Sequence, residues 1–199
     1  MKSAIILCGG QSRRMGQDKG SMNIEDKPMI IHVLDTLNNI IDEAIIVLND
    51  KNRIDRYEQF INEDDYDFEI MFVEDEIKNK GPLSGIKTGL ENISSEYGLI
   101  LPCDSPFITE EHVLNLFNEA DNRYDCIVPY HKDENKLKTS EPLHGIYGKK
   151  TVLKINDLLK KDLLRIKDLI KESNCKYLKI DEKKLLKEEF RNLNYPEDI

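Results

Sequence analysis

Glycines and cationic side chains follow the first apolar run of the chain. Residues 5–20 read I-I-L-C-G-G-Q-S-R-R-M-G-Q-D-K-G, so Gly9 and Gly10 end the apolar run, and Arg14 and Lys19 come shortly after them. Glycine lets the backbone approach a ligand with its N–H groups turned inward, and cations neutralise phosphate oxygens. The segment matches neither the Walker A spacing nor the G-x-G-x-x-G dinucleotide fingerprint. It predicts a phosphate-binding loop of another kind.

Asp104 is the strongest candidate for chemistry outside this loop. It follows an apolar run at 97–101 and lies between Pro102 and Pro106, which restrict the backbone around it. Magnesium sites that act on phosphates typically use one or two protein carboxylates, because substrate phosphates and water supply the other ligands. Asp104 is therefore a candidate Mg²⁺ ligand. The alternative is a turn or helix-cap role, which is common for aspartate before a helix.

Asp75 also follows an expected strand, at 68–73. Its carboxylate offers several acceptor positions for hydrogen-bond donors of a ligand. Because Glu74 and Glu76 flank it, the alternative is one residue of a solvated acidic turn.

The elements that must position these residues alternate along the chain. Strands are expected at 3–8, 44–48, 68–73, 97–101, 124–130, 141–147 and 176–180. Helices are expected at 29–41, 52–62, 149–160 and 163–172. Two further helices are expected to begin at Pro82, behind a Gly81 cap, and at Thr109. Residues 131–140 are expected to form a polar loop. This alternation predicts an α/β fold, a Rossmann-like three-layer α/β/α arrangement with a mostly parallel central sheet. Gly85 and Gly89, four apart in one helix, predict a close approach to the sheet or a ligand.

Length and composition limit the class of protein. The 199 residues predict one domain, 1–199, and the net charge of −9 argues against nucleic acid or an anionic membrane as partner. No apolar run approaches 18 residues, so no membrane span is expected. The four cysteines form no C-x-x-C pair, which favours reduced thiols, a cytoplasmic location and no zinc site. A monomer is the default expectation.

The loop at 5–20 resembles the signature of molybdenum cofactor guanylyltransferases, which reads L-A-G-G-x-S-x-R-M-G followed by D-K. The chain departs from this pattern at Cys8, whose small side chain suits the alanine position, and matches it at Leu7, Gly9, Gly10, Ser12, Arg14, Met15, Gly16, Asp18 and Lys19. Further segments resemble the family in the same order: G-P-L-S-G at 81–85, E-P-L-H at 141–144 and N-L-N-Y-P-E-D at 192–198. In the last of these, Tyr195 replaces a threonine.

The resemblance implies a nucleotide-diphospho-sugar transferase-like fold and Mg²⁺-dependent transfer of GMP from GTP to a molybdopterin-type cofactor. It implies that GTP is bound by Leu7, Cys8, Gly9, Gly10, Lys19, Asn49, Asp75 and Asp104. At the end of the second strand the register could place Leu48 or Asp50 at the position given to Asn49. The Asp75 carboxylate could accept from guanine N1–H and N2–H₂ together or from ribose hydroxyls. It implies catalytic roles for Arg14, Lys19 and Asp104, with Asp104 as the metal ligand. The implied acceptor side comprises Gly81, Pro82, His144, Asn192 and Asn194. Cofactor-handling proteins or molybdoenzymes are the implied protein partners.

Some of these assignments have a structural alternative. His144 could equally be a packed, hydrogen-bonded histidine, and Asn192 and Asn194 could serve as turn or cap residues ahead of Pro196.

Two other functions fit the same fold. One is a cytidylyltransferase, or another nucleotidyltransferase acting on a phosphorylated small molecule; the Gly9-Gly10 pair favours guanylyl transfer, because cytidylyl relatives usually read A-A-G there. The other is a non-catalytic nucleotide-binding module. The joint presence of Arg14, Lys19 and Asp104 favours an active enzyme.

Overall fold

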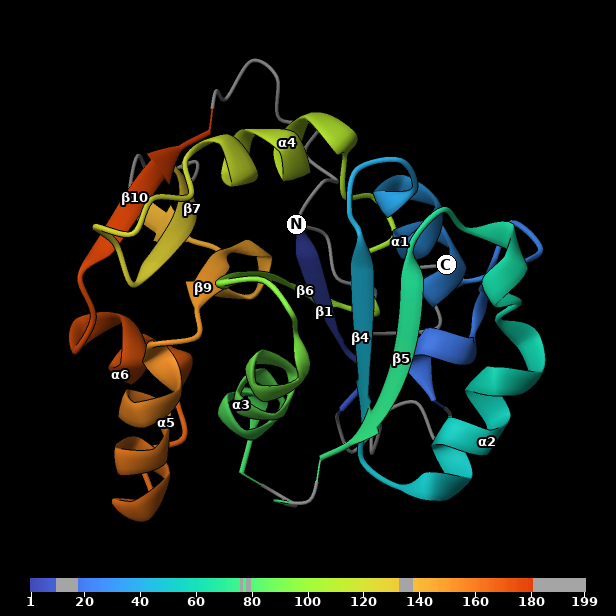
Figure 1. The fold of residues 1–199 in the computed structure, drawn as a ribbon, viewed down its shortest axis with the longest axis horizontal. Coiled ribbons are helices and arrows are strands. Elements are labelled where there is room, and N and C mark those ends of the chain that lie inside the picture. Colours follow the sequence, from blue (N-terminus) through green and yellow to red (C-terminus); the bar gives the residue numbers. More distant parts are fainter. Residues whose placement is uncertain (10–17, 76, 78–79, 133–137, 181–199) are drawn as a thin grey trace.

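A mostly parallel sheet forms the centre of the computed structural model, which describes residues 1–9, 18–75, 77, 80–132 and 138–180 (Figure 1). Its strands are β1 (Ser3–Leu7), β4 (Glu43–Leu48), β5 (Glu69–Glu74), β6 (Tyr97–Pro102), β7 (Cys126–Lys132), β8 (Lys138–Ser140), β9 (Ile146–Gly148) and β10 (Cys175–Lys179). They lie in the order β10-β7-β9-β6-β1-β4-β5, with β8 paired to β7. The antiparallel pairs all involve β8 or β9. A separate small ribbon joins β2 (Asn23–Ile24) to β3 (Lys27–Pro28).

Helices cover both faces of this sheet, so the predicted three-layer α/β/α fold is confirmed (Figure 1). One face packs against α1 (Met29–Leu37), α2 (Lys51–Phe60) and α4 (Glu110–Asn118). The other packs against α3 (Pro82–Asn92), α5 (Thr151–Lys160) and α6 (Ile166–Lys171). In β1, Ile6 faces the first layer and Ile5 the second, which explains why this strand reads as a continuous apolar run. Among the described residues, no helix has the length and apolar character that crossing a bilayer requires.

The chain changes direction across the sheet beside β1. It first builds β1, β4 and β5 toward one edge and then returns to place β6 on the other side of β1. In open α/β sheets, ligands bind at the carboxyl ends of the strands where such a switch occurs. The residues that follow β1, β5 and β6 are fixed there by backbone bonds from Cys8 N to Val47 O, Asp75 N to Leu48 O and Cys103 N to Leu7 O.

Helix α3 begins and packs as its sequence predicts. Gly81 caps it with φ = 67°, and Pro82 takes its first position. Both interior glycines face the sheet: a Cβ on Gly89 would lie 2.2 Å from Ile5 Cγ2, and one on Gly85 would lie 3.1 Å from Leu7 Cδ2. The predicted close approach of this helix to the sheet is therefore confirmed.

Several predicted boundaries were wrong. The helix expected at 29–41 ends at Leu37, because Asn39 adopts a positive φ of 63°. The strand expected at 141–147 instead opens with a 3-10 turn, η3 (Pro142–His144), since Pro142 sets the turn and β9 begins only at Ile146.

Two further corrections lie in the C-terminal half. The loop expected at 131–140 contains the end of β7 and all of β8, which pair antiparallel through backbone bonds and need no apolar pattern. The helix expected at 163–172 begins at Ile166, after Asp162 with its positive φ of 57°.

Candidate active site

Lys19 and Asp104 meet at the carboxyl edge of the sheet, where the chain switches sides. Lys19 opens the 3-10 turn η1 (Lys19–Ser21), and Asp104 follows β6. Lys19 Nζ lies 2.8 Å from Asp104 Oδ2, and their side chains are 22% and 14% exposed. Because both groups remain partly open to solvent, the ammonium can turn to phosphate oxygens and the carboxylate to a cation. The structure thus joins two of the three residues predicted to be catalytic; the third, Arg14, lies outside the described residues.

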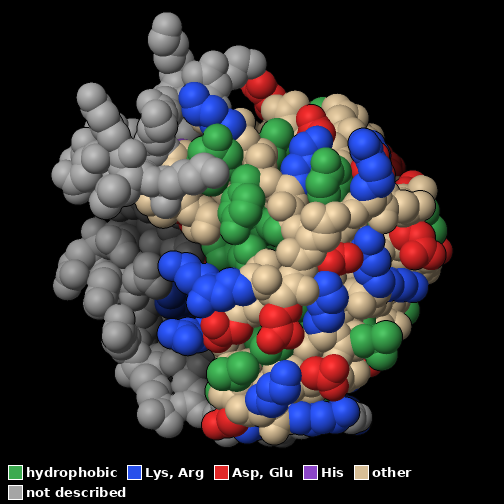
Figure 2. Space-filling model, turned by 90° about the vertical axis from the view of Figure 1, so that its left-hand side faces the viewer, with side chains coloured by type: hydrophobic (Ala, Val, Ile, Leu, Met, Phe, Trp, Pro, Cys, Tyr) green, Lys and Arg blue, Asp and Glu red, His purple; other side chains and the backbone are tan. Residues whose placement is uncertain are grey.

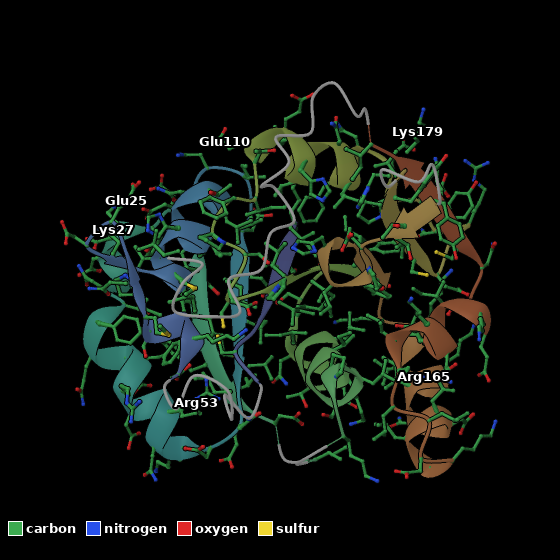
Figure 3. The ribbon with its side chains drawn as sticks, turned by 180° about the vertical axis from the view of Figure 1, so that it is seen from behind. Glu25, Lys27, Arg53, Glu110, Arg165 and Lys179 are labelled. Carbon is green, nitrogen blue, oxygen red and sulfur yellow. The ribbon has the colours of Figure 1, made fainter. Side chains whose placement is uncertain are left out.

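Asp18, next to Lys19, is held by two side chains of α2. Arg53 donates from Nη2 to Asp18 Oδ1 at 2.6 Å and from Nε to Oδ2 at 2.9 Å, and the Tyr57 hydroxyl donates to Oδ1 at 2.9 Å. The Asp18 and Arg53 side chains are only 6% and 15% exposed. Although burial opposes its charge, hydrogen bonds to Asp18 raise the pKa of Arg53. This clamp fixes the backbone from which Lys19 extends. Arg53 is labelled in Figure 3.

Gly20 allows the same segment to pack against α2 and the sheet edge. A Cβ at this position would lie 2.3 Å from the Tyr57 hydroxyl oxygen and 3.0 Å from Cys103 Sγ. Any larger residue would push the segment away from the clamp. Lys19 therefore sits between two residues whose positions are fixed by tertiary contacts.

We expect Arg53→Ala to lower both stability and turnover. Removing one partner of a buried ion pair leaves an uncompensated charge, and a loss of about 3 kcal/mol is expected, at the low end of such cases because Tyr57 still donates to Asp18. Turnover should fall at least roughly tenfold, because Lys19 loses its fixed position. Urea unfolding and kcat measure the two effects. Arg56→Ala is the matched control, since Arg56 lies exposed on the same helix, and equal losses in both variants would contradict the assignment.

Asp75 lies buried against the first turns of α3. Its Oδ2 accepts from Ser84 Oγ at 2.6 Å, and its Oδ1 accepts from the Ile77 backbone N–H at 3.2 Å and from Thr88 Oγ1 at 3.3 Å. The solvated acidic turn that was the alternative for Asp75 does not describe this position. Gly81 and Pro82, predicted on the acceptor side, begin the helix that holds it.

The end of β1 lies against the end of β4. A Cβ on Gly9 would lie 2.9 Å from Asn49 Oδ1, so Asn49 sits directly beside the predicted phosphate loop. Leu7 and Cys8 are buried beneath this point. Three other residues predicted to contact ligands lie outside the described part of the chain: Gly10, Asn192 and Asn194.

His144 is buried beside the turn that carries Asp104. Its Nε2 lies 3.0 Å from the hydroxyl of Ser105, the residue after Asp104, and its carbonyl oxygen lies 3.2 Å from His112 Nε2. Burial, with a smaller contribution from His112, lowers the pKa of His144 to about 3, so its imidazole is neutral at pH 7. The arrangement matches the alternative of a packed, hydrogen-bonded histidine, and the contact to Ser105 ties His144 to the turn that carries Asp104.

Sequence reasoning missed Arg53 and Tyr57. Both lie in the helix expected at 52–62, and neither belongs to a motif. The signal available in the sequence was Asp18, which lies beside a predicted catalytic lysine. A buried carboxylate needs a cationic or hydroxyl partner, so Asp18 could have prompted a search for one.

Comparison with known proteins shows the family of this chain. Residues 4–176 match the family described as "MobA-like NTP transferase domain". A protein of Methanothermobacter thermautotrophicus named "Probable molybdenum cofactor guanylyltransferase" is 34% identical over 100% of this chain and 98% of its own. The "Molybdenum cofactor guanylyltransferase" of Aliivibrio salmonicida is 31% identical over 98% of this chain and 92% of its own.

The fold is shared with a solved structure. Molybdopterin-guanine dinucleotide biosynthesis protein A from Archaeoglobus fulgidus superposes with a TM-score of 0.77 at 22% identity, over 98% of this chain and 94% of that one. The resemblance noted in the sequence is confirmed: the chain belongs to the MobA-like NTP transferase family and is a nucleotidyltransferase related to the molybdenum cofactor guanylyltransferases.

Proposed function

We propose that this nucleotidyltransferase transfers GMP from GTP to the phosphate of a molybdopterin-type cofactor in the cytoplasm. An acceptor phosphate oxygen forms a bond to the α-phosphorus, the bond from this phosphorus to the oxygen bridging to the β-phosphate breaks, and pyrophosphate leaves. The observation that carries the proposal is the Lys19–Asp104 contact at the carboxyl ends of β1 and β6. It supplies a cation and a metal-binding carboxylate at one point.

The chain's own residues act by positioning and charge. Lys19, held by its neighbour Asp18, neutralises charge on the α-phosphate and on the leaving pyrophosphate, and Arg14 is proposed to assist it. The backbone of Gly9 and Gly10 is proposed to approach the triphosphate. The acceptor phosphate is already an anion, so neither a covalent nucleophile nor a general base is required.

Asp104 fits the role of a magnesium ligand. It is a partly exposed carboxylate on a backbone that the β1–β6 ladder fixes through Cys103. No group of three or more His, Cys, Asp or Glu side chains suited to a metal occurs among the described residues. One protein carboxylate suits Mg²⁺, which keeps water and substrate phosphates as its other ligands. When bound, the metal would neutralise phosphate charge; Lys19 would then exchange its contact with Asp104 for the phosphates.

Asp75 is proposed to bind the nucleoside. A carboxylate offers about four acceptor positions, and Ser84, Ile77 and Thr88 occupy three of them. The remaining position, on Oδ2, suits one donor such as a ribose hydroxyl better than the paired N–H groups of guanine. Specificity for guanine would then depend on other groups, and Asn49 beside Gly9 is a candidate.

A nucleotide titration tests the proposal. With Mg²⁺ present, GTP should bind more tightly than CTP, ATP or UTP, and pyrophosphate release should require both GTP and the molybdopterin-type acceptor. Tightest binding of CTP would establish the cytidylyltransferase alternative instead. If the protein binds a nucleotide but releases pyrophosphate with none of the four, the non-catalytic nucleotide-binding module would be favoured.

A further inference from the structure

Two pairs of cysteines lie on, or directly after, neighbouring parallel strands. Cys126 and Cys175 are partners at the first residues of β7 and β10. Cys8 and Cys103 follow Leu7 and Pro102, which are partners at the ends of β1 and β6. In each pair, the interaction with the neighbouring thiol contributes to a shifted pKa, namely that of Cys8 in one pair and those of Cys126 and Cys175 in the other. The spacing of the cysteines along the sequence reveals neither pair, because the order of the strands in the sheet brings the members of each pair together.

The separation of neighbouring strands suits a disulfide. Paired strands lie about 4.8 Å apart, within the range of about 4.4–6.8 Å that separates the Cα atoms of disulfide-bonded cysteines. Cys126 and Cys175 also point to the same face of the sheet, where both pack in the α3–α5–α6 core. A bond between their sulfurs therefore needs little movement of the backbone.

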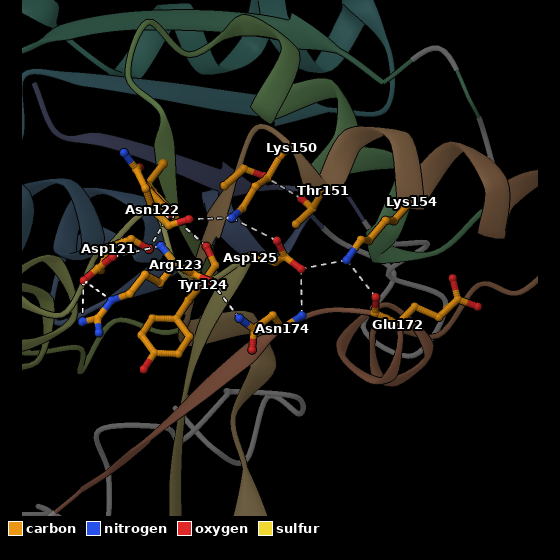
Figure 4. A network of polar contacts seen from close by, with 12 residues as sticks. Asp121, Asn122, Arg123, Tyr124, Asp125, Lys150, Thr151, Lys154, Glu172 and Asn174 are labelled. Carbon is orange, nitrogen blue, oxygen red and sulfur yellow. Dashed lines mark hydrogen bonds and ion pairs between the residues drawn. The ribbon is translucent and has the colours of Figure 1, made fainter.

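The residues before Cys126 and Cys175 are clamped to each other (Figure 4). The Asp125 backbone N–H donates to Asn174 O at 2.9 Å, and the Asn174 N–H donates to Asp125 Oδ2 at 2.7 Å. Lys154 and Lys150 contact the same Asp125 carboxylate at 2.7 and 3.1 Å. Burial raises the pKa of Asp125, but these bonds outweigh it and lower the pKa to about 2. The Asp125 carboxylate is therefore charged at neutral pH.

The two pairs differ in access and ionisation. Cys8, Cys103 and Cys126 are buried, whereas Cys175 is partly exposed. The hydrogen bond from Cys126 lowers the pKa of Cys175 despite its partial burial, with help from the Val128 backbone N–H. Burial raises the pKa of Cys8 well above its ordinary value, and the interaction with Cys175, together with burial, raises the pKa of Cys126. Thiolate character and exposure decide which cysteine is oxidised first, and Cys175 combines partial exposure with a lowered pKa.

We propose that Cys175 and Cys126 form a thiol pair that hydroperoxides oxidise reversibly to a disulfide. The Cys175 thiolate attacks one peroxide oxygen, the O–O bond breaks, and hydrogen peroxide yields one water and a Cys175 sulfenic acid. The Cys126 sulfur then attacks the Cys175 sulfur and releases a second water. Two thiols lose two electrons in total, and one peroxide gains them. A low-molecular-weight thiol reverses the step by exchange.

The bond would tie β10 to the rest of the sheet. β10 is an edge strand that pairs only with β7 among the described residues, and it lies on the face shown in Figure 2, where acidic and basic side chains mix with a few hydrophobic ones. A covalent link between β7 and β10 removes conformations from the unfolded chain. Oxidation should therefore stabilise this edge without involving Lys19 or Asp104.

Peptide mapping after oxidation tests the proposal, with Cys8 and Cys103 as the internal control pair. Reduced protein is treated with one equivalent of hydrogen peroxide, denatured, alkylated and digested without reductant. We expect a Cys126–Cys175 linked peptide, with Cys8 and Cys103 alkylated, and no link in Cys175→Ser. In Cys126→Ala, dimedone should trap a sulfenic acid on Cys175. Preferential linkage of Cys8 to Cys103, or alkylated Cys175 in oxidised wild type, would overturn the proposal.

Thermal unfolding gives a second readout. Oxidised wild type should melt roughly 5–10 °C above the reduced protein, and dithiothreitol should abolish the difference. Cys126→Ala and Cys175→Ser should each show no such gain. A gain of the same size in either variant would show that the stabilisation comes from another bond and would refute the assignment.

Discussion

Asp104→Ala is expected to lower kcat by roughly 10²–10³, the scale of losing one preorganised electrostatic group in an active site. The variant removes the proposed metal ligand and leaves Lys19 without its carboxylate partner. Folding should be retained, because Asp104 lies at the solvent-facing edge of the sheet and Lys19 can be solvated. Pyrophosphate release at saturating GTP and Mg²⁺, with circular dichroism as a check on folding, measures the effect.

Asp104→Asn separates the two contributions of this side chain. Asparagine can still accept a hydrogen bond from Lys19 but is a much weaker Mg²⁺ ligand than a carboxylate. If Asp104 holds the metal, the asparagine variant should lose nearly as much turnover as the alanine variant and should need more Mg²⁺ for half-maximal rate. Full turnover in a folded alanine variant would remove Asp104 from the mechanism.

Lys19→Ala should also lower kcat by roughly 10²–10³, because it removes the cation proposed to act on the transferred phosphate. Lys27→Ala is the matched control: Lys27 is 57% exposed and contacts Asp35 instead. The control should keep turnover and stability near those of the wild type. A folded Lys19→Ala protein with unchanged turnover would rule out this role.

The double variant tests whether Lys19 and Asp104 act as one unit. Residues that stabilise the same transition state are strongly non-additive when they are removed together. Lys19→Ala combined with Asp104→Ala should therefore lose far less than the product of the single losses. Independent, multiplicative losses would mean that the contact between their side chains has no part in turnover.

Much of the architecture could be predicted from local patterns. The apolar runs of β1, β4 and β6 are buried on both faces, and such strands read as continuous hydrophobic segments. The Gly81-Pro82 start of α3 and the Thr109 cap of α4, where Thr109 Oγ1 accepts from the His112 N–H, are also local chemistry. Errors occurred where backbone conformation or pairing decided the outcome, as at Asn39 and in β8.

For the site, the sequence by itself determined which residues are candidates for chemistry and where they lie relative to the strands and the glycine loop. Lys19, Asp75 and Asp104 were all identified from residue type and position relative to an apolar run or a glycine loop. The tertiary structure alone decided what they contact. The 2.8 Å approach of Lys19 to Asp104 spans 85 positions, and that of Arg53 to Asp18 spans 35. It also decided that His144 is buried and that two cysteine pairs lie on, or directly after, neighbouring strands. The physical reason is that periodicity, caps and turns depend on neighbours along the chain, whereas these contacts depend on the order of strands, which places β6 beside β1 and β10 beside β7.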